Sequence, residues 1–147
     1  MSIQDIHKIY KTHPAEGFEW VHPVAQPDYE LLRFDGTPRG ARWSPVKVER
    51  STHDENRRRL EPGDFPPGCG FVVSRAAKEY LRPCLEAAGE LLPLDCPDGE
   101  FWTLNVTRLV DALDEEGSEV LRSSETNRIL MIHPPRFHGS RLGPEIF

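Results

Sequence analysis

The clearest structural signal in this chain lies in residues 71–94, FVVSRAAKEYLRPCLEAAGELLPL. The apolar run 71–73 is typical of a short buried strand, and Ser74 follows it in the position of a helix N-cap. The next apolar residues recur at i, i+3, i+4, i+7, i+8 and i+11, which predicts a helix over 75–88 with one apolar face. That face consists of Ala77, Tyr80, Leu81, Cys84, Leu85 and Ala88.

The end of this helix and the segment after it are also marked in the sequence. Gly89 is expected to cap the helix, and Pro83, toward the polar side, is expected to kink it without breaking it. Residues 91–94 and 101–105 are predicted to be strands, and the Pro-Asp-Gly triplet at 97–99 is typical of a tight turn between them. A helix beside a hairpin is the expected centre of the fold.

The flanking regions give weaker predictions. Apolar spacing over 106–113 predicts a second helix, which the acidic run ending at Gly117 would terminate, and 127–133 is predicted to be a further strand. The first 62 residues are rich in proline, which leaves room only for short strands. Candidates are 18–22, 29–34 and 45–49.

These elements together predict an α+β fold with a mostly antiparallel sheet and two or three helices packed on it. At 147 residues the chain is expected to form a single domain over 1–147, with a proline-rich part at 1–62 and a recognisable core at 63–133.

Composition narrows the class of function. The net charge of −6 argues against nucleic acid, whose binding needs clustered cations, and suits a basic protein partner. We expect a cytoplasmic protein without membrane contact, because the sequence contains neither a run of about 20 apolar residues nor an apolar leader. Its three cysteines have no CxxC spacing, and Pro134-Pro135 between His133 and His138 excludes a helical ligand pair, so no metal or cofactor is predicted.

Motifs of nucleophilic catalysis are also missing from the sequence. It contains no GxSxG motif, no phosphate-binding glycine loop and no cysteine-protease signature around Cys69. We therefore do not expect an enzyme or any catalytic residue. The acids Asp111, Asp114, Glu115 and Glu116 are instead the candidate partner-binding residues, because a group of acids can steer association with a basic protein.

The order of several segments resembles immunity-protein family eleven of bacterial polymorphic-toxin systems, formerly a domain of unknown function. The matching segments are 64–65, 71–74, 91–94, 101–106 and 110–114, with a looser match at 43–45. The resemblance implies an α+β protein that binds and neutralises a cognate toxin and has no catalytic residues. Members tend to continue with another strand and a helix, so we expect a C-terminally shortened member.

Two other classes of function remain alternatives. A small-molecule-binding regulatory module would use the aromatic side chains of Phe18, Trp20, Tyr29, Trp43 and Trp102 as pocket walls. A small hydrolase would depend on Cys69 or on a histidine, and would need a base within hydrogen-bond reach of its nucleophile.

Overall fold

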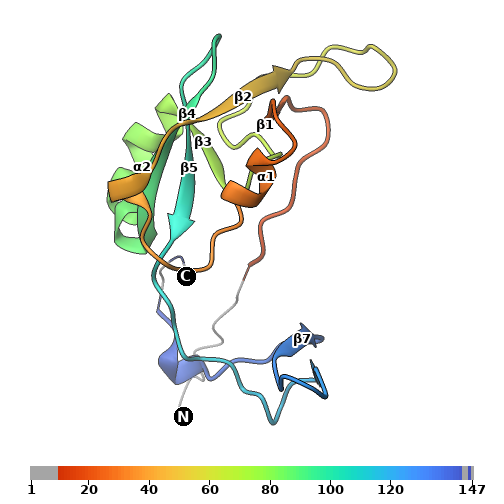
Figure 1. Ribbon diagram of the computed structural model, residues 1–147, viewed down its shortest axis with the longest axis vertical. Coiled ribbons are helices and arrows are strands. Elements are labelled where there is room, and N and C mark those ends of the chain that lie inside the picture. The colour runs from red at the N-terminus through yellow and green to blue at the C-terminus, as the bar shows by residue number, and fades with distance from the viewer. Residues whose placement is uncertain (1–9, 144–145, 147) are drawn as a thin grey trace, which may run out of the picture. The chain divides into compact units, whose positions relative to one another are not determined.

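The computed structural model describes residues 10–143 and 146 (Figure 1). The chain divides into two compact units: of the described residues, the main unit holds 11–109 and 146, and the C-terminal unit holds 110–143 and Tyr10. A five-stranded sheet belongs to the main unit, and a two-stranded sheet belongs to the C-terminal unit. The α+β class is confirmed, whereas a single domain over 1–147 stays a prediction.

The sheet of the main unit has the strand order β1-β2-β4-β5-β3. Its strands are β1 (Trp20–Pro23), β2 (Val46–Ser51), β3 (Val72–Ser74), β4 (Gly89–Asp95) and β5 (Phe101–Val106). Three of the neighbouring pairs are antiparallel, and β2 pairs with β4 in parallel through Val46 and Leu94. The sheet is therefore mixed. The predicted strands at 91–94 and 101–105 lie inside it as β4 and β5, whereas the strand predicted at 71–73 is its edge strand β3.

The predicted helix is α2 (Arg75–Ala88), which contacts β3, β4 and β5. Ser74 caps it by accepting a hydrogen bond from the Ala77 amide, and Pro83 lies within it on an exposed position. Its buried stripe is narrower than expected: Ala77, Leu85 and Ala88 are buried and Leu81 is partly buried. Tyr80 and Cys84 are exposed, because a helix lying on a sheet covers only the residues nearest the contact line.

Gly89 ends the helix as expected, since its amide donates to the Leu85 carbonyl. Its conformation is extended, with φ 172°, so Gly89 does not form the left-handed cap that glycine often supplies. The reason for glycine is the adjacent strand. A Cβ at this position would lie 2.9 Å from both the Asn105 carbonyl carbon and the Thr107 amide nitrogen.

Two elements differ from the sequence prediction. The segment 29–34 is not a strand: Asp28–Leu31 forms the short helix α1, which Pro27 and the acids of its first turn favour. The prediction of a second helix over 106–113 is also wrong. The amides of Thr107 and Arg108 both donate to the Ala88 carbonyl, which holds the chain in an extended path beyond β5.

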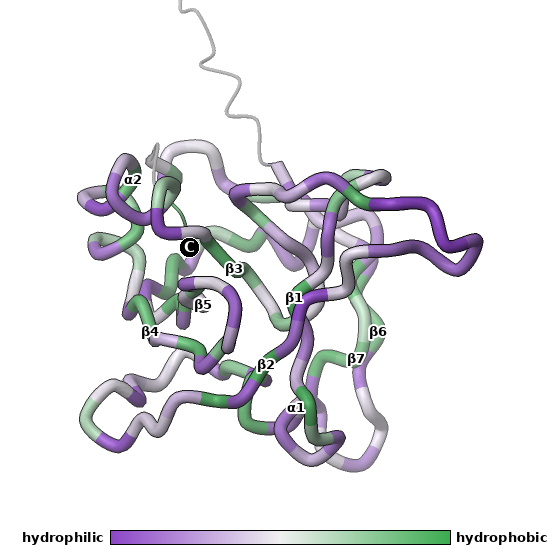
Figure 2. Tube along the Cα trace, turned by 90° about the horizontal axis from the view of Figure 1, so that it is seen from above, coloured by the Kyte–Doolittle hydropathy of each residue, from purple (hydrophilic) through white to green (hydrophobic). Residues whose placement is uncertain are grey.

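The apolar interior of the main unit has two clusters. One lies among β1, β2 and the loop at Cys69 and includes Val21, Val48 and Val72, with Phe34 and Trp43 packed against it. The other lies under α2 and includes Val73, Leu85 and Leu104. Val72 of β3 belongs to the first cluster and Val73 to the second, and the hydrophobic part of β3 is visible in Figure 2.

The C-terminal unit contains an antiparallel hairpin of β6 (Val120–Arg122) and β7 (Ile129–Ile132). The strand predicted over 127–133 is thus present, although it is shorter. A bridge between Leu113 and Phe137 and the 3-10 turn Gly139–Arg141 complete this unit.

Candidate functional site

The four predicted partner-binding acids lie in one irregular segment of the C-terminal unit. Asp114 turns the chain, because its side chain accepts a hydrogen bond of 2.9 Å from the Gly117 amide. Asp111 lies 3.4 Å from the Arg141 guanidinium, and Glu115 is paired with Arg122. Glu116 is exposed and has no ion-pair partner within the described part of the chain. The structure brings the four acids into one segment, and cations already balance two of them.

The hairpin that follows these acids exposes large apolar side chains. Leu121 on β6 is opposite Met131 on β7, and they are 53% and 57% exposed. Leu130, whose position in β7 alternates with Met131, is 63% exposed, and Ile129 is 38% exposed. Because neighbouring residues of a strand point to opposite faces, both faces of the hairpin present apolar surface. Figure 2 shows hydrophobic residues along both β6 and β7.

Cys69 is placed unfavourably for nucleophilic catalysis. Its side chain is buried, and its thiol donates a hydrogen bond of 3.1 Å to the Val21 carbonyl. Burial, together with a smaller effect of the nearby Cys96, raises the pKa of the Cys69 thiol to about 12. A thiol with this pKa is almost entirely protonated near neutral pH, so the hydrolase alternative gains no nucleophile from Cys69.

A serine and a histidine that the sequence did not single out lie next to each other on β1 and β2. The Nε2 atom of His22 is 2.8 Å from the Ser51 Oγ, and its Nδ1 atom is 3.8 Å from Glu49. The order resembles a catalytic triad, but 3.8 Å is too long for a hydrogen bond to orient the imidazole. These three residues form a cross-strand polar group, which only the β1–β2 register could have revealed.

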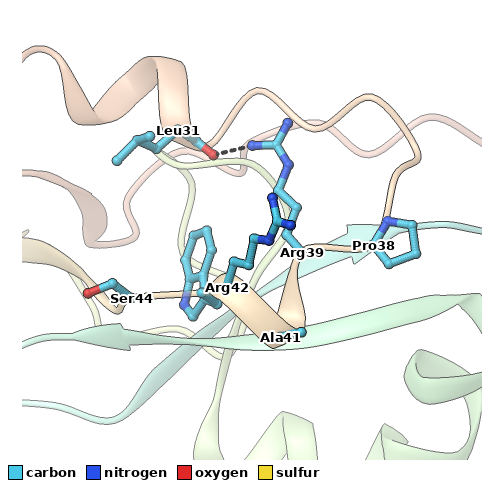
Figure 3. A pocket seen from close by; sticks show the side chains of 7 residues that line it. Leu31, Pro38, Arg39, Ala41, Arg42 and Ser44 are labelled. Carbon is cyan, nitrogen blue, oxygen red and sulfur yellow. Dashed lines mark hydrogen bonds between the residues drawn. The ribbon is translucent and has the colours of Figure 1, made fainter.

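The main unit also contains a pocket of about 500 Å³ beside the 3-10 turn Gly40–Arg42 (Figure 3). Its lining consists of Leu31, Pro38, Arg39, Ala41, Arg42, Trp43 and Ser44. Trp43 is held by a hydrogen bond of 2.8 Å from its indole nitrogen to the Pro93 carbonyl and by contact with the Phe34 ring. Of the five aromatic residues considered for a pocket, Trp43 is the one that lines this cavity.

Glu90 fixes the backbone that forms this pocket. Its carboxylate accepts hydrogen bonds from the amides of Arg39 at 2.7 Å and Gly40 at 3.1 Å, and from the Asn105 side chain at 3.0 Å. The Arg39 amide in particular, then Gly40 and Asn105, hold the pKa of Glu90 below its usual value. The turn is therefore tied to β4 and β5 through one charged side chain.

The two arginines of the pocket have different surroundings. The Arg39 guanidinium donates to the carbonyls of Leu31 and Arg33, lies 3.6 Å from Asp35 and stacks over the Phe34 ring. Arg42 is exposed, and within residues 10–143 its guanidinium has neither a hydrogen-bond acceptor nor an acidic partner. Figure 3 shows both side chains rising on the same side of the turn.

Within the described residues, no three or more histidine, cysteine, aspartate or glutamate side chains gather as metal ligands would. The three cysteines are free. In that same part of the chain, no helix combines the length and the apolar character that a membrane span requires.

Comparison of the chain with family models, curated proteins and solved structures found no match.

Proposed function

We propose that this chain is a bacterial immunity protein that binds a cognate protein toxin and neutralises it. The observation that carries this proposal is the apolar hairpin β6–β7, which exposes Leu121, Leu130 and Met131. Several large, exposed apolar side chains in one small element are uncommon on a protein that acts alone, and they typically mark an interaction site. The order of sequence segments described above supplies the expectation that the partner is a toxin.

The hairpin also has a physical need for a partner. A two-stranded sheet is at best marginally stable by itself in water, and among the described residues each strand of this hairpin pairs on one side only. A toxin domain that covers the hairpin would bury its apolar side chains and add free energy to a weak element. We expect an interface of about 1,600 Å² in total, with these residues near its centre.

The neighbouring acids suit the rim of such an interface. Asp111, Asp114, Glu115 and Glu116 belong to the same compact unit as the hairpin. A polar rim around an apolar centre is the usual composition of protein interfaces. Exposed charges there mainly accelerate the encounter with an oppositely charged partner, so a basic toxin surface is expected to face them.

The test is co-expression of this chain with the toxin domain encoded beside it, in a sensitive bacterium, with binding kinetics measured on the purified pair. One variant carries L121S, L130S and M131S, and a second carries D111N, D114N, E115Q and E116Q. Asparagine at position 114 keeps an acceptor for the Gly117 amide, so the turn survives in the second variant. The matched control is Y80S, which changes an exposed side chain of α2 in the other unit.

We expect the hairpin variant to dissociate faster and to lose protection, and the acid variant to associate more slowly with a weaker salt dependence. Y80S should protect fully. Equal killing with and without this chain would contradict the immunity function. Unaltered dissociation of the hairpin variant would exclude only the hairpin from the toxin interface. Unaltered association of the acid variant would exclude only the four acids from it.

A further inference from the structure

We propose that the pocket beside Trp43 binds a small organic carboxylate, whose anionic group pairs with Arg42 and whose apolar body lies against Trp43. The pocket belongs to the main unit, and the inference does not rest on toxin binding. Three features support it: the size and walls of the cavity, the lack of a partner for Arg42 among the described residues, and the hydrogen bonds that four amides of the turn already make.

The cavity is suited to a small molecule. Its volume of about 500 Å³ lies within the usual range for ligand pockets. Leu31, Pro38 and Trp43 provide apolar walls, and Leu31 is 52% exposed although it is a large hydrophobic residue. The Trp43 ring is fixed by its hydrogen bond to the Pro93 carbonyl and by its contact with the Phe34 ring, so little ordering of this wall is required when a ligand binds.

The charge distribution favours an anion. The Arg39 guanidinium is already satisfied by two carbonyls and by Asp35, whereas Arg42 has no such partner in the described chain. Both cationic side chains rise on the same side of the turn, as Figure 3 shows. A guanidinium presents a planar fork of N–H donors that matches a carboxylate in two parallel hydrogen bonds. Arg42 is therefore the group that recognises the anion.

The backbone of the turn argues for a carboxylate over a phosphate. Phosphate sites in loops commonly use several free amides that point at the anion. Here the amides of Arg39 and Gly40 donate to Glu90, and those of Arg42 and Trp43 donate to carbonyls within the turn. One free guanidinium next to an apolar wall is suited to a singly charged, planar anion with a hydrocarbon body.

The experiment titrates the full-length, ¹⁵N-labelled protein with phenylacetate, with its neutral analogue phenylacetamide and with inorganic phosphate. The readouts are the indole N–H signal of Trp43 and the Nε–H signal of Arg42. A probe of this size is expected to bind with a dissociation constant on the order of 1 mM. Phenylacetamide and phosphate should each bind at least about tenfold more weakly, because each lacks one of the two features that the pocket recognises.

Variants of Arg42 test whether its guanidinium binds the carboxylate. R42Q should weaken phenylacetate binding by about tenfold or more, and R42K should have an intermediate effect because it keeps the charge without the fork. R82Q is the matched control: it removes an exposed arginine on α2 and should leave the affinity unchanged. The folded state of each variant is verified by its amide spectrum.

Several results would overturn the proposal. They are absence of a Trp43 shift at millimolar phenylacetate, equal affinity for phenylacetamide, tighter binding of phosphate, or wild-type affinity in folded R42Q. A blocked peptide with a Phe-Asp sequence that binds more tightly than phenylacetate would replace the small molecule by a protein segment as the occupant.

Discussion

Replacement of Gly89 by alanine tests the packing between the end of α2 and β5. The φ of Gly89 is 172°, which alanine adopts without strain, so the cost of Gly89→Ala is entirely steric. The new Cβ would lie 2.9 Å from the Asn105 carbonyl carbon and the Thr107 amide nitrogen, and still closer to the Asn105 oxygen. Ordinary contacts between such atoms are about 3.5 Å, so the two strands must separate by more than half an ångström.

That separation has a calculable effect on stability. Overpacking costs about 1–3 kcal/mol, and it also weakens the two hydrogen bonds that Thr107 and Arg108 donate to the Ala88 carbonyl, each contributing about 1 kcal/mol. We expect the free energy of unfolding to fall by about 2–5 kcal/mol. For a unit of about 100 residues this lowers the Tm by roughly 10–25 °C, measured by circular dichroism or calorimetry.

Gly17→Ala is the matched control, because its added Cβ would meet no atom within 4 Å although its φ is +85°. A single alanine in this left-handed conformation costs about 1–2 kcal/mol, so the Tm should fall by only about 5–10 °C. If Gly89→Ala were no more destabilising than Gly17→Ala, the close approach of β5 to Gly89 would be refuted.

Further predictions concern the core, Glu90 and the cysteines. Leu85→Ala should lower the free energy of unfolding by about 2–5 kcal/mol in urea titration, since Leu85 is 1% exposed. Leu81→Ala should cost less, because Leu81 is only partly buried, and an equal or larger loss would contradict this packing. Because the pKa of Glu90 is lowered in the folded state, its contribution is complete above its unfolded pKa and is lost as the pH falls through its folded pKa. Glu90→Gln should therefore be less stable than the native chain near pH 6, and the difference should shrink as the pH falls through the folded pKa of Glu90; a difference independent of pH would contradict the role of the carboxylate. Iodoacetamide near pH 8 should alkylate the exposed Cys84 while Cys69, with a pKa of about 12, reacts only after unfolding, as peptide mass spectrometry would show. Equal alkylation rates of Cys69 and Cys84 in the folded protein would be inconsistent with the buried thiol.

Local patterns predicted the centre of the fold and little of its periphery. The helix Arg75–Ala88 and strands β4 and β5 have clear periodicity, a capping serine and a turn triplet, all of which act over short distances. The helix expected over 106–113 did not form, because its first amides pair with the Ala88 carbonyl, and no local pattern reports such a partner.

The same distinction applies to the candidate sites. The acids at 111–116 are adjacent in sequence and could be selected from it. The pocket beside Trp43 could not, since it depends on Glu90, about fifty residues later, binding the amides of Arg39 and Gly40. That Arg42 has no acidic partner among the described residues is likewise visible only in the folded chain. The hairpin register, which places Leu121 opposite Met131, also depends on the bulge that interrupts it.

The parallel pairing of β2 with β4 has a consequence for the order of folding. Val46 pairs with Leu94, so this contact closes a loop of about fifty residues, whereas α2, β4 and β5 follow one another directly along the chain. Loop closure is entropically unfavourable until the contact it permits has formed, and it slows folding. We expect the transition state to contain α2 with the β4–β5 hairpin and the proline-rich strands to dock afterwards. Substitutions in β2 should then mainly accelerate unfolding, whereas those at the α2–β5 contact should slow folding.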